Sequence, residues 1–393
     1  MHDELRTLVV IAAIAAAVPF IVGLLRIRIA QVVILLALGV IFGPQVLGLI
    51  EITDPIALLS ELGMGFLFFL AGLEIERRAV TGADGRLAII GWGSSILVGA
   101  AIAWTLAITG AIVDGFGVAI ALTTSALGTL LPVLRDAGQL ETPFGRLFMG
   151  AAAWGEFGPI IAIAILLGTK SPMLSVLSLT VFAAIATIFL ILPGRLRSPS
   201  VERIIEQGRK SSSQTAIRLV MLVLLALLWI SSDLGIDAVL GAFVAGIIVK
   251  RFASESDESG VEKKIEAIAF GFFIPLFFVV SGATLDIRSI IENPLRLIAA
   301  LVAILVARGL PQLIVYRRAL PDIRSRGAFS LYVATGLPLL VAITSIEVAA
   351  GAMEASNAAS LVGAGALSVL LFPLGADLLL RRSRAQERAA KTA

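Results

Sequence analysis

The stretch "ALTTSALGTLLPVL" (121–134) places a glycine and a proline in the middle of a long apolar run. A second stretch, "LYVATGLPLLVAI" (331–343), repeats this composition about 210 residues later. Proline removes a backbone donor and glycine weakens a helix, so each stretch predicts a helix that is broken near its middle. The predicted break points are Gly128 and Pro132 in the first stretch and Gly336 and Pro338 in the second.

The composition predicts a polytopic membrane protein. Of the 393 residues, 58% are hydrophobic and only 15% are charged, and the mean hydropathy is +1.01. Apolar runs long enough to cross a bilayer recur from end to end, and such runs span it as helices. The fold class expected is therefore all-α. The chain has no cysteine, which excludes disulfides, thiol catalysis and cysteine metal sites.

We expect about thirteen transmembrane helices, whose ends are often marked by Gly-Pro, Asp-Pro or Asn-Pro pairs. If the spans alternate from an outer N-terminus to a cytoplasmic C-terminus, most of the 31 Lys and Arg residues fall in cytoplasmic loops. The expected spans are about 7–25, 29–43, 55–73, 87–109, 112–134, 145–168, 172–193, 216–232, 236–249, 266–285, 297–316, 327–347 and 357–380.

Two similar pairs of segments predict an inverted repeat. "LFFLAGLEIE" (67–76) in the third span resembles "LFFVVSGATLDI" (276–287) in the tenth, at the same separation as the two broken stretches. Both pairs are seven spans apart, and an odd number reverses the direction through the membrane. Inverted repeats with paired discontinuous helices are the architecture of secondary transporters. We expect one transmembrane domain over 1–393, with repeat one at about 29–168, repeat two at about 236–380 and a linker at about 194–214.

Glu156 and Arg308 are the charged residues near the middle of predicted spans. Each costs about 2.5–3.5 kcal/mol at a helix centre on insertion scales. One interpretation is a buried ion pair that only joins two helices. The functional interpretation is that Glu156 binds a proton and a metal cation in turn. The remaining acidic residues of the spans are placed towards span ends: Glu61, Glu74, Asp114, Asp233 and Glu347.

Several motifs resemble the monovalent cation:proton antiporter superfamily, in its Kef/Nap-like branch. They are "IAQVVILLALGVIFGPQVLGLI" (29–50), "LSELGMGFLFFLAGLEIERRAV" (59–80) and "ALTTSALGTLLPVLRDAG" (121–138). The resemblance covers essentially the whole chain. It implies a sodium/hydrogen exchanger-type transmembrane domain that exchanges Na⁺ or K⁺ for H⁺ by alternating access. It also implies a homodimer in the bacterial plasma membrane and a role in pH homeostasis, without a cofactor.

The resemblance also assigns the candidate site. Glu156 would bind the proton or, transiently, the monovalent cation, and Arg308 stands where the family has a membrane-embedded Lys or Arg. In the family, the helix after the first broken helix normally carries an acidic residue, Asn or Gln, followed by Asp, whereas this chain has Gly155 followed by Glu156. With one carboxylate, the exchange is expected to be electroneutral. We also expect no C-terminal nucleotide-binding regulatory domain of the kind found in many relatives. The hydroxyl groups beside the first break are further candidate ligands: Thr123, Thr124 and Ser125.

Other functions remain as alternatives. An enzyme is disfavoured because the one histidine is His2 and neither an H-E-x-x-H nor a G-x-S-x-G pattern occurs. A cation channel could use the same helices, although it would not need a carboxylate that is neutralised in every cycle. An organic-solute transporter of a related crossed-helix fold is the third candidate. Nucleic acid is not an expected partner, since the basic residues lie in short loops between apolar segments.

Overall fold

In the part of the chain that the computed structural model describes, the regular secondary structure is helical and no strand occurs. Three groups of predicted features lie outside the described residues: the break points Gly128 and Pro132, most of the seventh span, and 194–213 of the linker. The described residues are 2–25, 30–74, 82–109, 112, 115–127, 130, 134, 139–166, 180–188, 214–234, 238–252 and 260–392.

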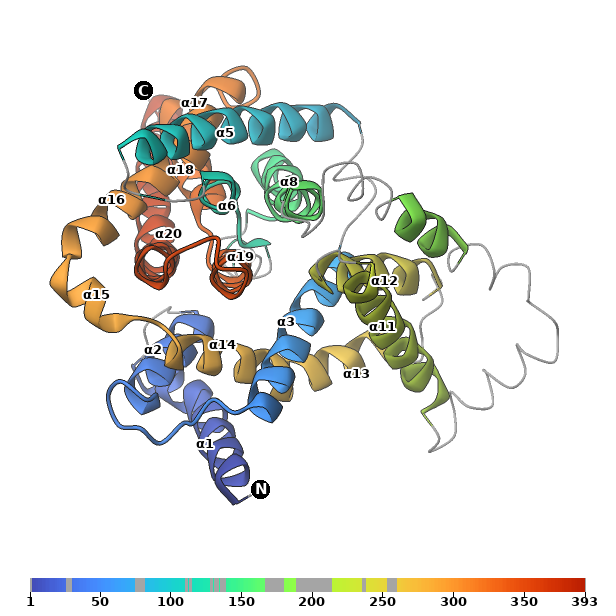
Figure 1. Ribbon diagram of the computed structural model, residues 1–393. Coiled ribbons are helices and arrows are strands. Elements are labelled where there is room, and N and C mark those ends of the chain that lie inside the picture. The colour runs from blue at the N-terminus through green and yellow to red at the C-terminus, as the bar shows by residue number, and fades with distance from the viewer. Residues whose placement is uncertain are drawn as a thin grey trace. The chain divides into compact units, whose positions relative to one another are not determined.

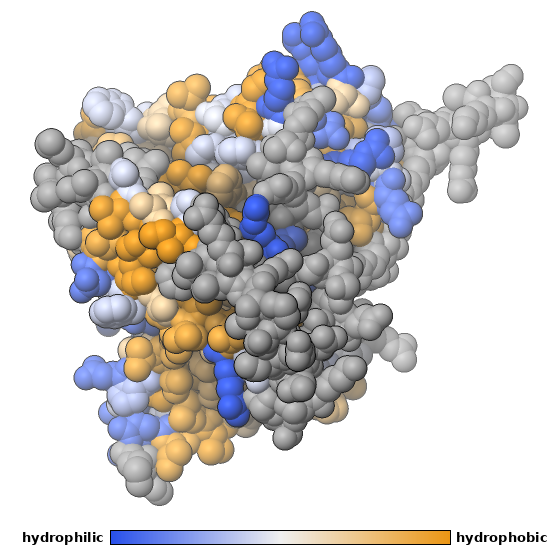
Figure 2. Space-filling model, turned by 90° about the vertical axis from the view of Figure 1, so that its right-hand side faces the viewer, coloured by the Kyte–Doolittle hydropathy of each residue, from blue (hydrophilic) through white to orange (hydrophobic). Residues whose placement is uncertain are grey.

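Eight helical segments in the described residues are long and apolar enough to cross a membrane. The polytopic all-α class is therefore confirmed, whereas the count of thirteen spans is not. Apolar residues cover much of the coloured surface in Figure 2, as expected where side chains face lipid. The eight segments are Asp3–Leu24, Asp54–Leu73, Asp84–Ile108, Thr215–Asp233, Val261–Ala283, Pro294–Val315, Ile323–Ala349 and Ala355–Leu380.

The chain divides into two compact units. Unit 1 comprises Met1–Ala15, Glu51–Ile75 and Ile160–Val280. It contains most of α1 (His2–Leu25), α3 (Asp54–Glu74), α11 (Thr215–Asp233), α12 (Ala238–Phe252), α13 (Val261–Ile268), the π-helical turn η1 (Ala269–Phe273) and most of α14 (Ile274–Ala283).

Small residues allow the main contact within unit 1, between α3 and α12. A methyl group on Gly72 would overlap the carbonyl oxygen of Phe243, and one on Gly246 would overlap that of Phe69. Two helix backbones can approach this closely only where both sides lack a side chain, which is a common way of packing helices in membranes.

Unit 2 comprises Ala16–Ile50, Glu76–Pro159 and Ser281–Ala393. Within it, α6 packs on α5 and α19, and α20 packs on α16, α18 and α19, as the labels in Figure 1 allow the reader to follow. Its helices are α2 (Gln31–Phe42), α5 (Gly82–Ile108), α6 (Gly115–Ala121), α8 (Pro143–Leu166, up to Pro159), α15 (Ile287–Glu292), α16 (Pro294–Ile304), the π-helical turn η2 (Leu305–Gly309), α17 (Leu310–Val315), α18 (Ile323–Ala334), α19 (Pro338–Ala349) and α20 (Ala355–Thr392).

Both predicted broken helices of unit 2 are interrupted. The second one ends as α18 at Ala334 and resumes as α19 at Pro338, with 335–337 non-helical, so Gly336 lies in the break and Pro338 begins the helix that follows it. The first one ends as α6 at Ala121, and 122–126 are non-helical before Leu127 is again helical. This break thus begins ahead of Gly128, at the hydroxyl residues.

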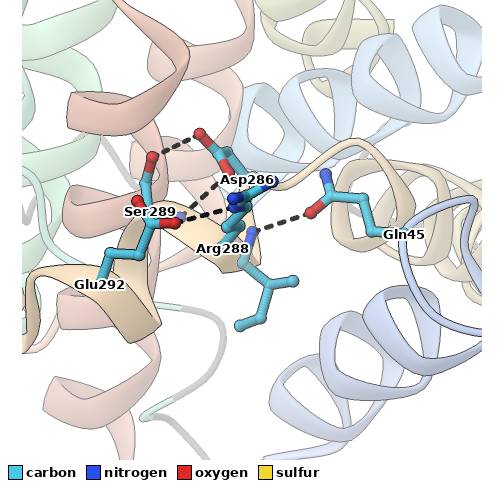
Figure 3. Close-up of polar contacts among 6 residues, drawn as sticks. Gln45, Asp286, Arg288, Ser289 and Glu292 are labelled. Carbon is cyan, nitrogen blue, oxygen red and sulfur yellow. Dashed lines mark hydrogen bonds and ion pairs between the residues drawn. The ribbon is translucent and has the colours of Figure 1, made fainter.

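A polar clamp joins two loops of unit 2 (Figure 3). The Gln45 side chain donates a hydrogen bond to the carbonyl of Leu285 at 2.9 Å and accepts one from the backbone N–H of Ile287 at 3.2 Å. Asp286 caps α15, and the hydrogen bonds from the Ser289 hydroxyl and backbone N–H lower the pKa of its carboxyl group. Both loops lie on the same side of the membrane in the predicted topology.

Candidate functional site

The two helix breaks meet in unit 2 and form the centre of the candidate site. The backbone N–H of Ala126, in the first break, donates to the carbonyl of Thr335, in the second, at 2.8 Å. The N–H of Ser125 donates to the carbonyl of Gly155 on α8 at 3.1 Å. Gly336 is needed for the close approach, because a methyl group there would lie 2.8 Å from the Thr124 hydroxyl oxygen. The backbone N–H groups of Ser125 and Ala126, in the first break, are thus bonded to α8 and to the second break.

The three hydroxyl groups predicted as ligands are buried at this crossing. Thr123 and Thr124 donate to the carbonyls of Ile120 and Ala121, at 2.8 and 3.0 Å, and so cap the last turn of α6. Ser125 donates to the carbonyl of Val333 at 2.6 Å. A hydroxyl that donates one hydrogen bond still has oxygen lone pairs, so these bonds do not prevent the oxygens from contacting a cation.

Glu156 lies on α8 next to the first break and is partly exposed. Its Oε1 accepts a hydrogen bond from the backbone N–H of Leu127 at 2.8 Å. A helical turn begins there, since the N–H of Leu130 donates to the carbonyl of Ala126. The positive end of a helical turn favours a negative group, so this contact stabilises the ionised carboxylate.

Arg308 is fully buried in the π-helical turn η2 and belongs to the same unit. Nε donates to the Ser125 hydroxyl at 3.0 Å, Nη2 to the carbonyl of Ala151 at 2.7 Å, and Nη1 to the Ser95 hydroxyl at 3.4 Å. Among the described residues, its hydrogen bonds therefore go to hydroxyl and carbonyl groups rather than to Glu156. The ion pair between the two mid-span charges, which the sequence left open, is not formed there.

Gly155 makes room for this arrangement. A methyl group at Gly155 would overlap the Ser125 hydroxyl and lie 2.5 Å from Nη2 of Arg308. The absent side chain at this position therefore leaves the space that the guanidinium group and the Ser125 hydroxyl fill. The position of Arg308 therefore depends on the glycine at position 155, where the chain departs from the family pattern.

Two residues that the sequence analysis missed surround Arg308. Gln312 is fully buried, and its amide nitrogen donates to the Ser95 hydroxyl, to the carbonyl of Arg308 and to that of Gly91, at 3.1–3.2 Å. The Ser95 hydroxyl in turn donates to the carbonyl of Gly91 at 2.9 Å. The four-residue spacing from Arg308 to Gln312 places both side chains on one helix face, and this spacing was the available signal.

Ser368 on α20 was also missed, and it supports the second break. Its hydroxyl oxygen accepts a hydrogen bond from the N–H of Gly336 at 3.3 Å and donates to the carbonyl of Gly365 at 2.7 Å. Glu347 was placed towards the end of a span, which agrees with its position in the last turn of α19, but its side chain is only 1% exposed. Position in the sequence therefore did not reveal how deeply this carboxyl group is buried.

No metal-ligand cluster of three or more His, Cys, Asp or Glu residues occurs in the part of the chain that the structure describes. A site here would instead combine one carboxylate, Glu156, with neutral oxygens of the crossing. Such a set suits a weakly held monovalent cation better than a tightly bound divalent ion, because it offers only one negative charge.

Comparison with known proteins identifies relatives among named antiporters. The chain is 24% identical over 407 residues to the putative Na⁺/H⁺ antiporter YjbQ of Bacillus subtilis, covering 98% of this chain and 65% of that protein. It is 30% identical over 293 residues to the Na⁺/H⁺-K⁺ antiporter GerN of Bacillus cereus, with 72% and 73% covered. The glutathione-regulated potassium-efflux protein KefC of Escherichia coli K12 is 23% identical, with 100% and 63% covered. The chain thus spans slightly less than two thirds of YjbQ and KefC.

A solved structure and a family model agree with these relatives. The sodium proton antiporter MjNhaP1 of Methanocaldococcus jannaschii has the same fold, with a TM-score of 0.63 at 18% identity over 94% of this chain and 98% of that one. The model for the sodium/hydrogen exchanger transmembrane region matches residues 9–382. The protein therefore belongs to the sodium/hydrogen exchanger family of integral membrane transporters.

Proposed function

We propose that this protein is a secondary antiporter that exchanges a monovalent cation, Na⁺ or K⁺, for H⁺ by alternating access. The observation that carries the proposal is Glu156, a partly exposed carboxyl group bonded to the backbone at a helix break. The relatives named as Na⁺/H⁺ and K⁺ transporters support the choice of ions.

Exchange takes place at one carboxylate. With a proton bound, Glu156 is neutral; with a cation bound, its negative charge is balanced by the ion. The two ligands compete because they need the same oxygens, so the binding of one requires the release of the other. The Leu127 N–H stabilises the ionised form that receives the cation. The hydroxyl oxygens of Thr123, Thr124 and Ser125 supply neutral ligands beside it.

Arg308 compensates charge at the crossing and does not exchange protons. A guanidinium group keeps its charge at any working pH, and here its three donor nitrogens are held by Ser125, Ser95 and Ala151. It supplies a fixed positive charge close to the break, while the carboxylate changes its ligand. Cation binding then requires no release of an Arg308–Glu156 ion pair.

We further infer an electroneutral cycle, in which one H⁺ replaces one cation, because position 155 offers no second carboxylate. The family resemblance supports a homodimer in a bacterial plasma membrane, with the N-terminus outside and the C-terminus cytoplasmic. Two hydrogen bonds agree with this topology, because each joins two segments that it places on the same side of the membrane. The Thr7 hydroxyl accepts a hydrogen bond from the N–H of Glu51 in unit 1, and Gln45 bonds to Leu285 in unit 2.

The proposal is tested in proteoliposomes that carry a pH-sensitive dye inside. An imposed Na⁺ or K⁺ gradient should move protons in the opposite direction through the native protein. Glu156→Gln keeps the shape of the side chain but cannot ionise, so it should abolish this signal while expression is retained. Glu292→Gln, at an exposed residue of α15, is the matched control and should behave like the native protein.

Each alternative predicts a different result. A cation channel would pass Na⁺ or K⁺ without the coupled proton movement, and an organic-solute transporter would respond to neither ion by moving protons in exchange. Comparable exchange by Glu156→Gln would show that the site lies elsewhere.

A further inference from the structure

A strip of three side chains on η2 and α17 faces α5 within unit 2. Arg308, Gln312 and Tyr316 follow one another at four-residue spacing, which places them on one helix face, and all three are fully buried. Both η2 and α17 pack on α5, and Figure 1 shows α17 beside α5. The side chains of Arg308 and Gln312 have hydrogen bonds to α5, whereas the proposed cycle gives Tyr316 no role.

Two oxygen atoms on this strip have no hydrogen-bond partner among the described residues. They are the hydroxyl oxygen of Tyr316 and Oε1 of Gln312, and both atoms are buried. A buried polar atom without a partner costs free energy, so nearly all such atoms in folded proteins are bonded to protein or to an ordered water molecule. Their occurrence together on one helix face points to a bound molecule that both of them contact.

The surroundings of the Gln312 amide determine its orientation. Its nitrogen lies 3.2 Å from the carbonyl oxygen of Gly91 and 3.1 Å from that of Arg308. Carbonyl oxygens only accept hydrogen bonds, so the reversed amide would bring three acceptors together there. Oε1 is therefore correctly placed on the other side of the amide group, and it needs a donor.

Oε1 and the Tyr316 ring border the same space next to Gly91. A methyl group built on Gly91 would lie 2.5 Å from Oε1 and 3.4 Å from Cε2 of Tyr316, the ring carbon next to the one that carries the hydroxyl group. This space is left because residue 91 has no side chain. It is bordered by one group that can donate and accept, the hydroxyl, and by one that can only accept.

We propose that a buried water molecule is bound between the Tyr316 hydroxyl group and Oε1 of Gln312. The water accepts a hydrogen bond from the hydroxyl group and donates one to Oε1, so both buried atoms gain a partner. The charges that act on Tyr316, those of Arg308 and Asp84, have opposite signs, so an ion of either sign would lack a net countercharge there. A small neutral molecule that both donates and accepts fits this place.

The water makes Tyr316 a positioning residue for Arg308. From the water the contacts continue through the Gln312 amide, whose nitrogen donates to the Ser95 hydroxyl and to the carbonyl of Arg308. The Ser95 hydroxyl also accepts from Nη1 of Arg308. Without the water the amide can turn, which weakens the contacts of the guanidinium group. Only this effect on exchange rests on the proposed antiport function.

The direction of one stability change tests the water site. Tyr316→Phe removes the hydroxyl group alone. The melting temperature in detergent should fall, because the water and Oε1 lose a partner, whereas removal of an unpartnered hydroxyl would leave it unchanged or raise it. The other tyrosine of the chain provides the comparison: the Tyr332 hydroxyl donates directly to Asp377 at 2.6 Å, and Tyr332→Phe should lower the melting temperature in the same way.

A structure of the native protein at a resolution that shows ordered water distinguishes a bridging water from a direct hydrogen bond. Density for one water is expected at about 2.5–3.2 Å from the Tyr316 hydroxyl oxygen and from Oε1 of Gln312. Direct contact between these two oxygens, or no density between them, would reject the water site. This measurement needs no variant to fold.

The positioning role is tested by the pH profile of exchange in proteoliposomes. Tyr316→Phe should retain exchange and shift the profile in the same direction as Ser95→Ala, by about half a pH unit, which corresponds to roughly threefold in proton affinity. The double variant should shift it by less than the two single shifts together, because both act through Gln312. Ser94→Ala added to Tyr316→Phe should cause no further shift.

The outcomes separate the two proposals. If the native protein exchanges neither ion, the antiport function fails, while the melting temperatures and the density still decide on the water. If the native protein exchanges ions but Tyr316→Phe is at least as stable, the water site is rejected. If the water is found but the pH profile of Tyr316→Phe equals the native one, or its shift adds fully to that of Ser95→Ala, the positioning role of Tyr316 is rejected.

Discussion

The two charged residues that the sequence places near the middle of spans, Arg308 and Glu156, have opposite surroundings. Arg308 is fully buried, and each of its three guanidinium nitrogens donates to a hydroxyl or carbonyl oxygen. Glu156 is partly exposed and its Oε1 is bonded to a backbone N–H at the helix break. One group is held in a fixed packing position, and the other can meet ions.

This difference suits the two charged groups to different roles at the crossing. A buried charge whose donors are satisfied stabilises one geometry, while a carboxylate near solvent can change its ligand at little structural cost. In the proposed cycle, Arg308 therefore defines the shape of the site and Glu156 performs the exchange. Variants at Arg308 should disturb both folding and the pH profile, whereas Glu156→Gln should affect transport alone.

The largest effect is expected from Arg308→Met, which removes the charge and all five donors from a buried site. The hydroxyl of Ser125 and the carbonyl of Ala151 would each lose the hydrogen bond from Arg308, at a cost of about 1–3 kcal/mol for each buried group left unsatisfied. Exchange should be abolished, and the melting temperature in detergent should fall clearly. Both are measured on the same purified protein.

Arg308→Lys is the graded counterpart. A lysine keeps the charge but cannot reproduce the fork that reaches Ser125 and Ala151 together. It should retain exchange with a shifted pH profile and a smaller loss of stability. A lysine variant that matches the native protein in both measurements would show that the fork geometry is not needed.

The next effect is expected at Gly155. Gly155→Ala places a methyl group where the Ser125 hydroxyl and Nη2 of Arg308 now lie, and overpacking of this kind costs about 1–3 kcal/mol. The matched control is Gly93→Ala on α5, where a methyl group meets no atom within 4 Å. Equal melting temperatures for the two variants would contradict the role given to Gly155.

The sequence predicts the broken helices and the two mid-span charges, but it cannot predict how they contact each other. Gly336 and Pro338 mark the second break because proline and glycine act locally on the backbone. The first break falls at 122–126 because hydroxyl groups and the partner break bond the backbone there, and this depends on segments about 200 residues apart.

The same limit explains why the sequence did not predict the contacts of Arg308 or the burial of Glu347. Charge and depth suggest an Arg308–Glu156 pair, whereas the space left by Gly155 directs the guanidinium group to Ser125 and Ala151. Glu347 lies near a helix end, where sequence predicts access to water, yet Gly117 on α6 lets it pack inside unit 2. In both cases the missing information is the absence of a side chain on another helix.

A smaller effect is expected from the residues behind Arg308. Ser95→Ala removes a hydroxyl that accepts from both Arg308 and Gln312, and should cost about 1 kcal/mol or somewhat more. Ser94→Ala is the control, since among the described residues the Ser94 hydroxyl bonds only to the carbonyl of Ile90 four residues earlier. Only the first variant should also shift the pH profile of exchange; parallel behaviour of the two would remove Ser95 from the support of Arg308.

The last and smallest effect concerns the membrane potential, which should not change the rate of exchange. One H⁺ replacing one Na⁺ at Glu156 moves equal charge in both directions, because Gly155 supplies no second carboxylate and the charge of Arg308 does not change. A two-for-one exchange would instead respond to the potential with about 2.3 kcal/mol per net charge per 100 mV. Proteoliposomes in which valinomycin and K⁺ set the potential, and Na⁺ gradients drive exchange, measure this directly. If an imposed potential drives proton movement through the native protein, a second group titrates during the cycle, and the division between a fixed and an exchanging charge must include that group.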